Sequence, residues 1–135
     1  MQINRRTFVL AAVALIGFAG WSAIRPGGKE IAVLRVFDGH GKDYFASLWV
    51  VDDASGFVWI QADRPDERWL SVVEANADVE LRRRGRSSKY VARVYDTPEA
   101  RAYVAPRFRT KYGLADRLRE WRSGRDTIPV RLQIR

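Results

Sequence analysis

The stretch YFASLWVVDDASGFVWIQA, residues 44–62, decides the fold. Its two ends, 44–51 and 57–62, are rich in aromatic and β-branched residues, which favour strands. Between them DDASG, residues 52–56, holds turn-forming residues, and Gly56 can adopt the positive φ of a tight turn. The pattern therefore predicts an antiparallel hairpin.

More strands are expected on both sides of this hairpin. They cover 31–37, 79–83, 89–95 and 127–134, and the middle two form a second hairpin around Gly85. Short strands joined by turns are typical of antiparallel sheets that curl into small barrels.

Helical segments are expected after the third and the fifth strand. They run over 67–76, from 98 to about 105, and over 114–121. Asp66 and Thr97 are the predicted N-caps of the first two. Pro106 is expected to interrupt the second helix, because proline lacks the N–H that a helix interior needs, and a short segment then runs to Gly113. The order of elements predicts an α+β domain: a small antiparallel barrel of about six strands with two or three helices, closed by its last strand.

The chain begins with an apolar leader. Residues 7–24 carry no charge, and as a helix they would be about 27 Å long, close to the thickness of a bilayer core. We expect a hydrophobic helix and linker over 1–28 and the folded domain over 29–135. Both a retained membrane anchor and a signal cleaved after Gly17-Phe18-Ala19 fit the pattern.

The motif NRRTFVL, residues 4–10, resembles the twin-arginine export signal. An ordinary secretion leader with two arginines is the alternative. Substrates of the twin-arginine route are exported folded, often with a cofactor bound, so this resemblance implies a cofactor-loaded domain. The expected location is the membrane or the periplasmic, extracytoplasmic side.

Composition excludes several kinds of site. The chain has no cysteine and one histidine, His40, so no disulfide and no zinc site of the usual His/Cys kind is expected. The net charge is +8, and LRRRGRSSK, residues 81–89, gathers four arginines at a hairpin turn. A solvated tip that blunts a strand edge is one interpretation, and binding to anionic lipid is the second. Nucleic acid is not expected as a partner, because the tip has few aromatic residues for stacking on bases.

Four stretches in this order carry a family resemblance: GKDYFASLWVVDD (41–53), WLSVVEANADVEL (69–81), VARVYDTPEAR (91–101) and TIPVRLQIR (127–135). The chain resembles the deazaflavin-dependent nitroreductase and quinone reductase family. That family has the split β-barrel fold of flavin reductases and pyridoxamine-phosphate-oxidase-like proteins.

The resemblance implies an oxidoreductase. Its cofactor would be a reduced deazaflavin of the 8-hydroxy-5-deazaflavin type or FMN. Its electron acceptor would be a quinone-like or nitro compound at the membrane. The protein would assemble as a homodimer. The chain departs from the family at two phosphate-binding segments: GHGK (39–42), with Tyr44 where the family has arginine, and QADR (61–64). These departures favour the alternative, a non-catalytic, membrane-anchored split-barrel module that binds a ligand.

The residues themselves suggest how a cofactor would be held, although they single out no catalytic residue. Lys42 lies on a turn whose glycines leave backbone N–H groups accessible to a phosphate. Since strands 44–51 and 57–62 are expected to pair, the start of one and the end of the other would meet, and Lys42 and Arg64 would share that phosphate. The candidate cofactor-binding residues are Gly41, Lys42, Tyr44, Gln61, Arg64, Trp69, Lys111 and Tyr112. Of these, Gln61 would bond the ring carbonyls or the phosphate, Trp69 would flank the ring, and the Lys111-Tyr112 pair would close the site.

Overall fold

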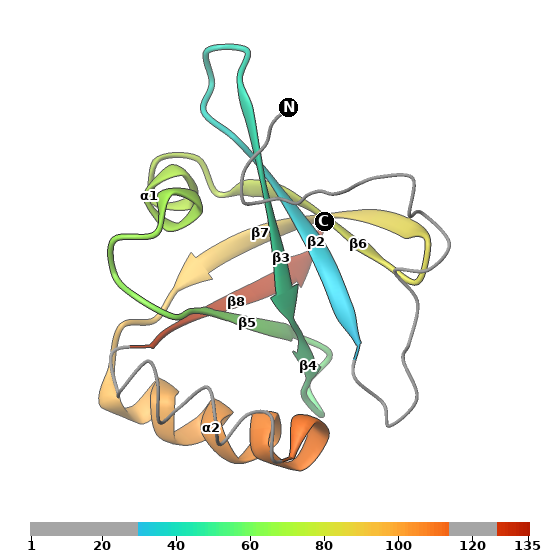
Figure 1. The fold of residues 1–135 in the computed structure, drawn as a ribbon, viewed down its shortest axis with the longest axis vertical. Coiled ribbons are helices and arrows are strands. Elements are labelled where there is room, and N and C mark those ends of the chain that lie inside the picture. Colours follow the sequence, from blue (N-terminus) through green and yellow to red (C-terminus); the bar gives the residue numbers. More distant parts are fainter. Residues whose placement is uncertain (1–29, 114–126) are drawn as a thin grey trace.

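The computed structural model describes residues 30–113 and 127–135. In these residues one antiparallel sheet curls into a half-barrel, with two helices packed on it (Figure 1). The strands are β2 (Ile31–Phe37), β3 (Asp43–Trp49), β4 (Val51–Asp52), β5 (Val58–Ala62), β6 (Asp78–Arg83), β7 (Arg86–Val94) and β8 (Ile128–Ile134), and the helices are α1 (Arg68–Ala75) and α2 (Pro98–Tyr112). This architecture confirms the predicted fold class.

The strand order explains why the sheet curls. Neighbours run β3-β2-β6-β7-β8-β5-β4, so β3 and β4 lie at the two ends of the sheet. Only Val50 separates these two strands in the chain. The two edges must therefore meet at Val50, which turns a flat sheet into a barrel.

The predicted hairpin of 44–51 with 57–62 is confirmed only at its turn. Val51 and Asp52 pair with β5, and Gly56 has a φ of 88°. All of β3, however, pairs with β2 through the turn at 38–42, so the prediction is wrong for most of the first strand. The physical reason is that the chain changes partners at Val50, which residue propensities do not show. The strands expected at 31–37, 79–83, 89–95 and 127–134 are present with small shifts of their ends.

The core lies inside the barrel. Alternate residues of β2, namely Ala32, Leu34 and Val36, are fully buried, as the two-residue period of a strand requires. Helix α1 packs against β2, β3 and β7 and adds Trp69 and Val73 to this core. A second apolar cluster lies between α2 and the outer side of β4 and β5; its buried members are Val51, Trp59, Val104, Phe108 and Tyr112.

The helix ends differ in part from the predictions. Thr97 is the N-cap of α2, since its hydroxyl accepts a bond of 3.1 Å from the N–H of Ala100. The predicted cap at Asp66 is wrong: α1 begins after Glu67, whose side chain makes no capping bond to the helix. The predicted break at Pro106 is also wrong, because α2 continues to Tyr112. Burial of aromatic side chains beyond Pro106 offsets the hydrogen bond that proline cannot make.

Two predicted helices fall outside the described residues: the leader at 7–24 and the segment at 114–121. The boundary expected at 28–29 lies outside them as well. Among residues 30–113 and 127–135, neither helix has the length and apolar character needed to cross a membrane.

Candidate cofactor site

Two of the predicted site residues come together at the start of β3. Tyr44 is half-buried, and the amino group of Lys42 lies 5.5 Å from the centre of its ring. The guanidinium carbon of Arg68 lies 5.4 Å from the same centre, and its Nη1 donates a bond of 3.3 Å to the Tyr44 hydroxyl. Lys42 and Arg68 are both exposed, so one aromatic ring is flanked by two cations that a ligand can reach.

Sequence reasoning missed Arg68. It is the first residue of α1, and it reaches Tyr44 because α1 packs against β3. No local pattern in the chain signals this contact, since the two residues are 24 positions apart.

Two backbone N–H groups of the turn at 38–42 are not accessible to a phosphate, contrary to the prediction. The carboxylate of Asp38 accepts bonds from the N–H groups of His40, at 2.7 Å, and Lys42, at 3.1 Å. These bonds lower the pKa of Asp38. A side-chain anion of the protein itself thus occupies the position that was predicted for a phosphate.

In the loop after β5, a side-chain carboxylate also occupies the backbone N–H groups. Glu67 accepts bonds from the N–H groups of Asp63, at 2.7 Å, and Arg64, at 3.2 Å, through one oxygen. Its other oxygen accepts the indole N–H of Trp69 at 2.8 Å. Arg64 itself forms an exposed ion pair with Asp66, with a closest N–O distance of 3.4 Å.

The remaining predicted residues near this end are less open than expected. Trp69 is 5% exposed and belongs to the core, so burial leaves it little free surface to flank a ligand ring. Gln61 is half-buried and lies opposite Pro129 in the ladder between β5 and β8. Gly41 has a φ of 85°, which explains why glycine stands there in the exposed turn.

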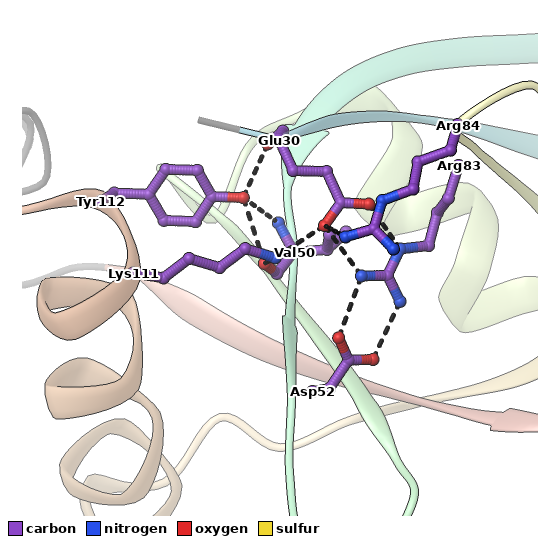
Figure 2. Close-up of polar contacts among 7 residues, drawn as sticks. All are labelled: Glu30, Val50, Asp52, Arg83, Arg84, Lys111 and Tyr112. Carbon is purple, nitrogen blue, oxygen red and sulfur yellow. Dashed lines mark hydrogen bonds and ion pairs between the residues drawn. The ribbon is translucent and has the colours of Figure 1, made fainter. Parts of the chain in front are cut away.

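Lys111 and Tyr112 lie at the other end of the β2–β3 hairpin (Figure 2). The amino group of Lys111 donates to a carboxylate oxygen of Glu30 and to the carbonyl of Val50, both at 2.7 Å. Tyr112 donates to the carbonyl of Glu30 at 2.6 Å. Since β3 is seven residues long, about 20 Å separates this end from the turn that holds Lys42. The structure therefore does not bring the Lys111-Tyr112 pair to the Tyr44 end.

Glu30 is the centre of this second group. It is 1% exposed, and Arg83 binds both of its carboxylate oxygens at 2.8 Å while also pairing with Asp52 (Figure 2). Burial alone would raise the pKa of Glu30, but the bonds from Arg83 and Lys111 outweigh it and lower the pKa to about 2. The carboxylate is thus a fixed anion that ties β2, β6 and α2 together.

The cofactor implied by the family resemblance can be tested against this geometry. Backbone donors for a phosphate are occupied by Asp38 in the turn and by Glu67 in the loop. Two exposed cationic side chains beside an aromatic ring are present. The site fits an anionic, planar group held by side chains, and it does not fit a phosphate cradled by the backbone.

Comparisons with known proteins give likenesses of fold. No protein-family model matches the chain, and no curated protein matches it. An F420-H2 dependent reductase (FDR-A) superimposes with a TM-score of 0.60 at 17% identity, over 76% of this chain and 93% of that one. HutZ, described as the heme storage protein from Vibrio cholerae, gives a TM-score of 0.62 at 16% identity, over 79% and 82%.

A third structure, described as a domain-swapped dimer, gives a TM-score of 0.62 at 18% identity, over 82% of this chain and 81% of that one. All three likenesses are too distant in sequence to carry more than the fold. They place the chain among proteins with the split β-barrel fold.

Proposed function

We propose that the protein is an oxidoreductase that uses a reduced deazaflavin cofactor, or FMN, to reduce a quinone-like or nitro acceptor. The observation that carries this proposal is the Lys42–Tyr44–Arg68 group, an aromatic ring flanked by two accessible cations. Support also comes from the fold, which an F420-H2 dependent reductase shares. A chain without cysteine needs a bound cofactor for redox chemistry.

In this proposal the protein binds and orients, and the cofactor supplies the hydride chemistry. Lys42 and Arg68 hold the anionic part of the cofactor by charge-assisted bonds. Tyr44 offers a flat, half-buried surface against which a planar ring packs. Arg68 keeps the phenol in place through its bond to the hydroxyl.

The proposed setting is the membrane or its extracytoplasmic side. The uncharged stretch 7–24 would anchor or export the domain, and a lipid-soluble quinone would be close at hand. A homodimer is also proposed, supported by the family resemblance and by a domain-swapped dimer among proteins of the same fold.

A second candidate function is a non-catalytic module that binds a ligand at the membrane. The observation that favours it is the pair of carboxylates, Asp38 and Glu67, that occupy backbone donors in the two loops. In a protein that had lost its phosphate site, we expect such carboxylates to bind the backbone N–H groups that once bound the phosphate. The description of HutZ as a heme storage protein shows that another protein of this fold has a storage role.

Cofactor titration of the purified full-length chain separates the two candidates. We expect the wild type to bind the deazaflavin cofactor or FMN. The titration uses the oxidised forms, whose rings fluoresce, and the change in that fluorescence measures binding. The variant Lys42→Ala with Arg68→Ala should bind at least about tenfold more weakly, which is about 1.4 kcal/mol. Its melting temperature should be nearly unchanged because both side chains are exposed.

The matched control is Lys89→Ala with Arg107→Ala, which removes the same two kinds of charge elsewhere on the surface. It should leave cofactor affinity as in the wild type. A wild type that binds neither cofactor would favour the non-catalytic module.

A further inference from the structure

The turn between β6 and β7 forms a surface of one sign. Arg82, Arg84 and Arg86 are exposed there, and no acidic residue occurs from 81 to 95. Neither Arg82 nor Arg86 forms an ion pair with a residue in the described part of the chain. Within the described residues, the guanidinium groups of Arg82 and Arg86 are therefore available to bind an anion from outside, and Arg84 is exposed beside them although it also pairs with Glu30.

The β6–β7 turn is a tight two-residue turn, and both of its residues have a left-handed backbone conformation. Arg84 has a φ of 50° and Gly85 a φ of 80°, the left-handed pair of a two-residue hairpin turn. Asparagine or glycine is the usual residue at the first of these positions, and arginine is uncommon there. The chain thus keeps a cation at the outermost point of the hairpin despite the backbone conformation.

The tip is fixed beside the place where the leader joins the domain. Arg83 is held by Glu30 and by Asp52, and a guanidinium nitrogen of Arg84 lies 3.7 Å from the Glu30 carboxylate (Figure 2). Glu30 follows Ile24, the last residue of the apolar stretch, by six positions. An extended chain of that length spans about 21 Å at most, so a leader seated in a bilayer would keep Glu30 near its surface.

We propose that the β6–β7 tip binds the anionic head groups of phospholipids in the membrane that holds the leader. Guanidinium groups suit lipid phosphates because they donate two parallel hydrogen bonds and remain charged at any physiological pH. Clusters of basic residues next to a membrane segment bind anionic lipid in this way. The proposal rests on the membrane placement given under Proposed function, and it adds a specific contact that orients the barrel on the surface.

The absence of cysteine makes the contact directly measurable. Ser87→Cys places one label at the exposed tip, and Ser71→Cys places one on the exposed side of α1, which lies away from the tip (Figure 1). The full-length chain, carrying a polarity-sensitive fluorophore at either site, is mixed with vesicles of phosphatidylcholine alone or with phosphatidylglycerol added. Flotation of the vesicles reports association separately from the label.

The charge variant is Arg82→Glu with Arg86→Glu, and its matched control is Arg64→Glu with Arg107→Glu. We expect the label at position 87, but not at 71, to shift to the blue only when phosphatidylglycerol is present. The tip variant should lose this shift, the control should keep it, and added salt should weaken it. If the charge reversal prevents folding, as judged by circular dichroism, Arg82→Gln with Arg86→Gln gives the same test without reversing the charge.

The outcomes separate the tip from the anchor. Association with both kinds of vesicle, with no shift that depends on phosphatidylglycerol, overturns the tip contact and leaves the anchor standing. Association only with phosphatidylglycerol vesicles, lost in the tip variant, supports the tip and overturns the anchor. Association with neither overturns both. Tip-dependent binding of duplex DNA at physiological salt, without the lipid shift, would overturn the proposal in favour of a nucleic-acid partner.

Discussion

The hydroxyl of Tyr112 lies 3.0 Å from the amide nitrogen of Val50, and this bond joins the end of α2 to the residue where the barrel closes. Val50 is fully buried and stands between β3 and β4. Tyr112 accepts from its N–H, and Lys111 donates to its carbonyl. Buried backbone N–H and C=O groups need hydrogen-bond partners. Two side chains of α2 therefore supply the partners for the N–H and the carbonyl of Val50.

The first prediction concerns this corner. Tyr112→Phe removes the acceptor for the Val50 N–H and leaves that group buried without a partner. We expect the free energy of unfolding to fall by about 1–3 kcal/mol. Urea unfolding of the full-length chain measures this change. Tyr103→Phe, which removes an exposed hydroxyl bonded to Asp53, is the control and should cost less. Equal stability of Tyr112→Phe and the wild type would contradict the role given to the helix.

The second prediction uses the ionisation of Glu30. Its pKa falls from 4.5 to about 2 on folding, so the group stabilises the fold above its unfolded pKa and loses that effect as the pH falls toward 2. Glu30→Gln should cost roughly 3 kcal/mol of unfolding free energy at pH 7. The difference between variant and wild type should shrink between about pH 5 and pH 2.

Urea unfolding at a series of pH values tests this dependence. Glu74→Gln, which changes an exposed carboxyl on α1, is the control and should show no comparable cost at pH 7. A cost of Glu30→Gln that stays constant from pH 7 to pH 2 would show that the carboxylate charge is not what holds the group together.

The third prediction concerns the proline inside α2. Pro106 is exposed and lacks the N–H that would bond one turn earlier in the helix. Replacing it with alanine restores that donor, so Pro106→Ala should stabilise the protein by about 1–2 kcal/mol after the entropy of the unfolded chain is counted. Thermal unfolding measures the gain, and Pro65→Ala in a loop is the comparison. A lower melting temperature for Pro106→Ala would mean that the helix needs the proline for its packing.

Much of the fold could be predicted from the sequence. The apolar, β-branched run of β2, the turn residues around Gly56 and Gly85, and the Thr97-Pro98 start of α2 are local signals, and the structure confirms the element that each predicts. The strand partners of β3 could not be predicted, because pairing depends on where the sheet closes and not on the residues of one strand.

The candidate site shows the same limit. Lys42 and Tyr44 are two positions apart, so the sequence could suggest them together, but Arg68 joins them only through the packing of α1 on β3. Glu30 was missed because a carboxylate at the start of a strand resembles an ordinary surface residue. Its burial results from contacts with Arg83 and Lys111, 53 and 81 positions away.

The fourth prediction tests whether the Asp38 carboxylate limits the proposed site. Asp38→Asn keeps an oxygen that can accept from the turn but removes a negative charge close to Lys42. Cofactor affinity should rise roughly two- to threefold, as expected for one charge screened by solvent. The same fluorescence titration measures it, with Asp96→Asn, in an exposed position before α2, as the control. Weaker binding by Asp38→Asn would show that the carboxylate supports the ligand.

Reduction of a quinone by the full-length chain tests the central claim most directly. Reduced deazaflavin and a short-chain quinone are mixed with the protein, and the oxidation of the deazaflavin is followed by its absorbance. The account predicts oxidation that depends on protein concentration, falls at least about tenfold in the variant Lys42→Ala with Arg68→Ala, and is unchanged by Lys89→Ala with Arg107→Ala. Oxidation no faster than without protein, with either reduced deazaflavin or reduced FMN, would contradict it.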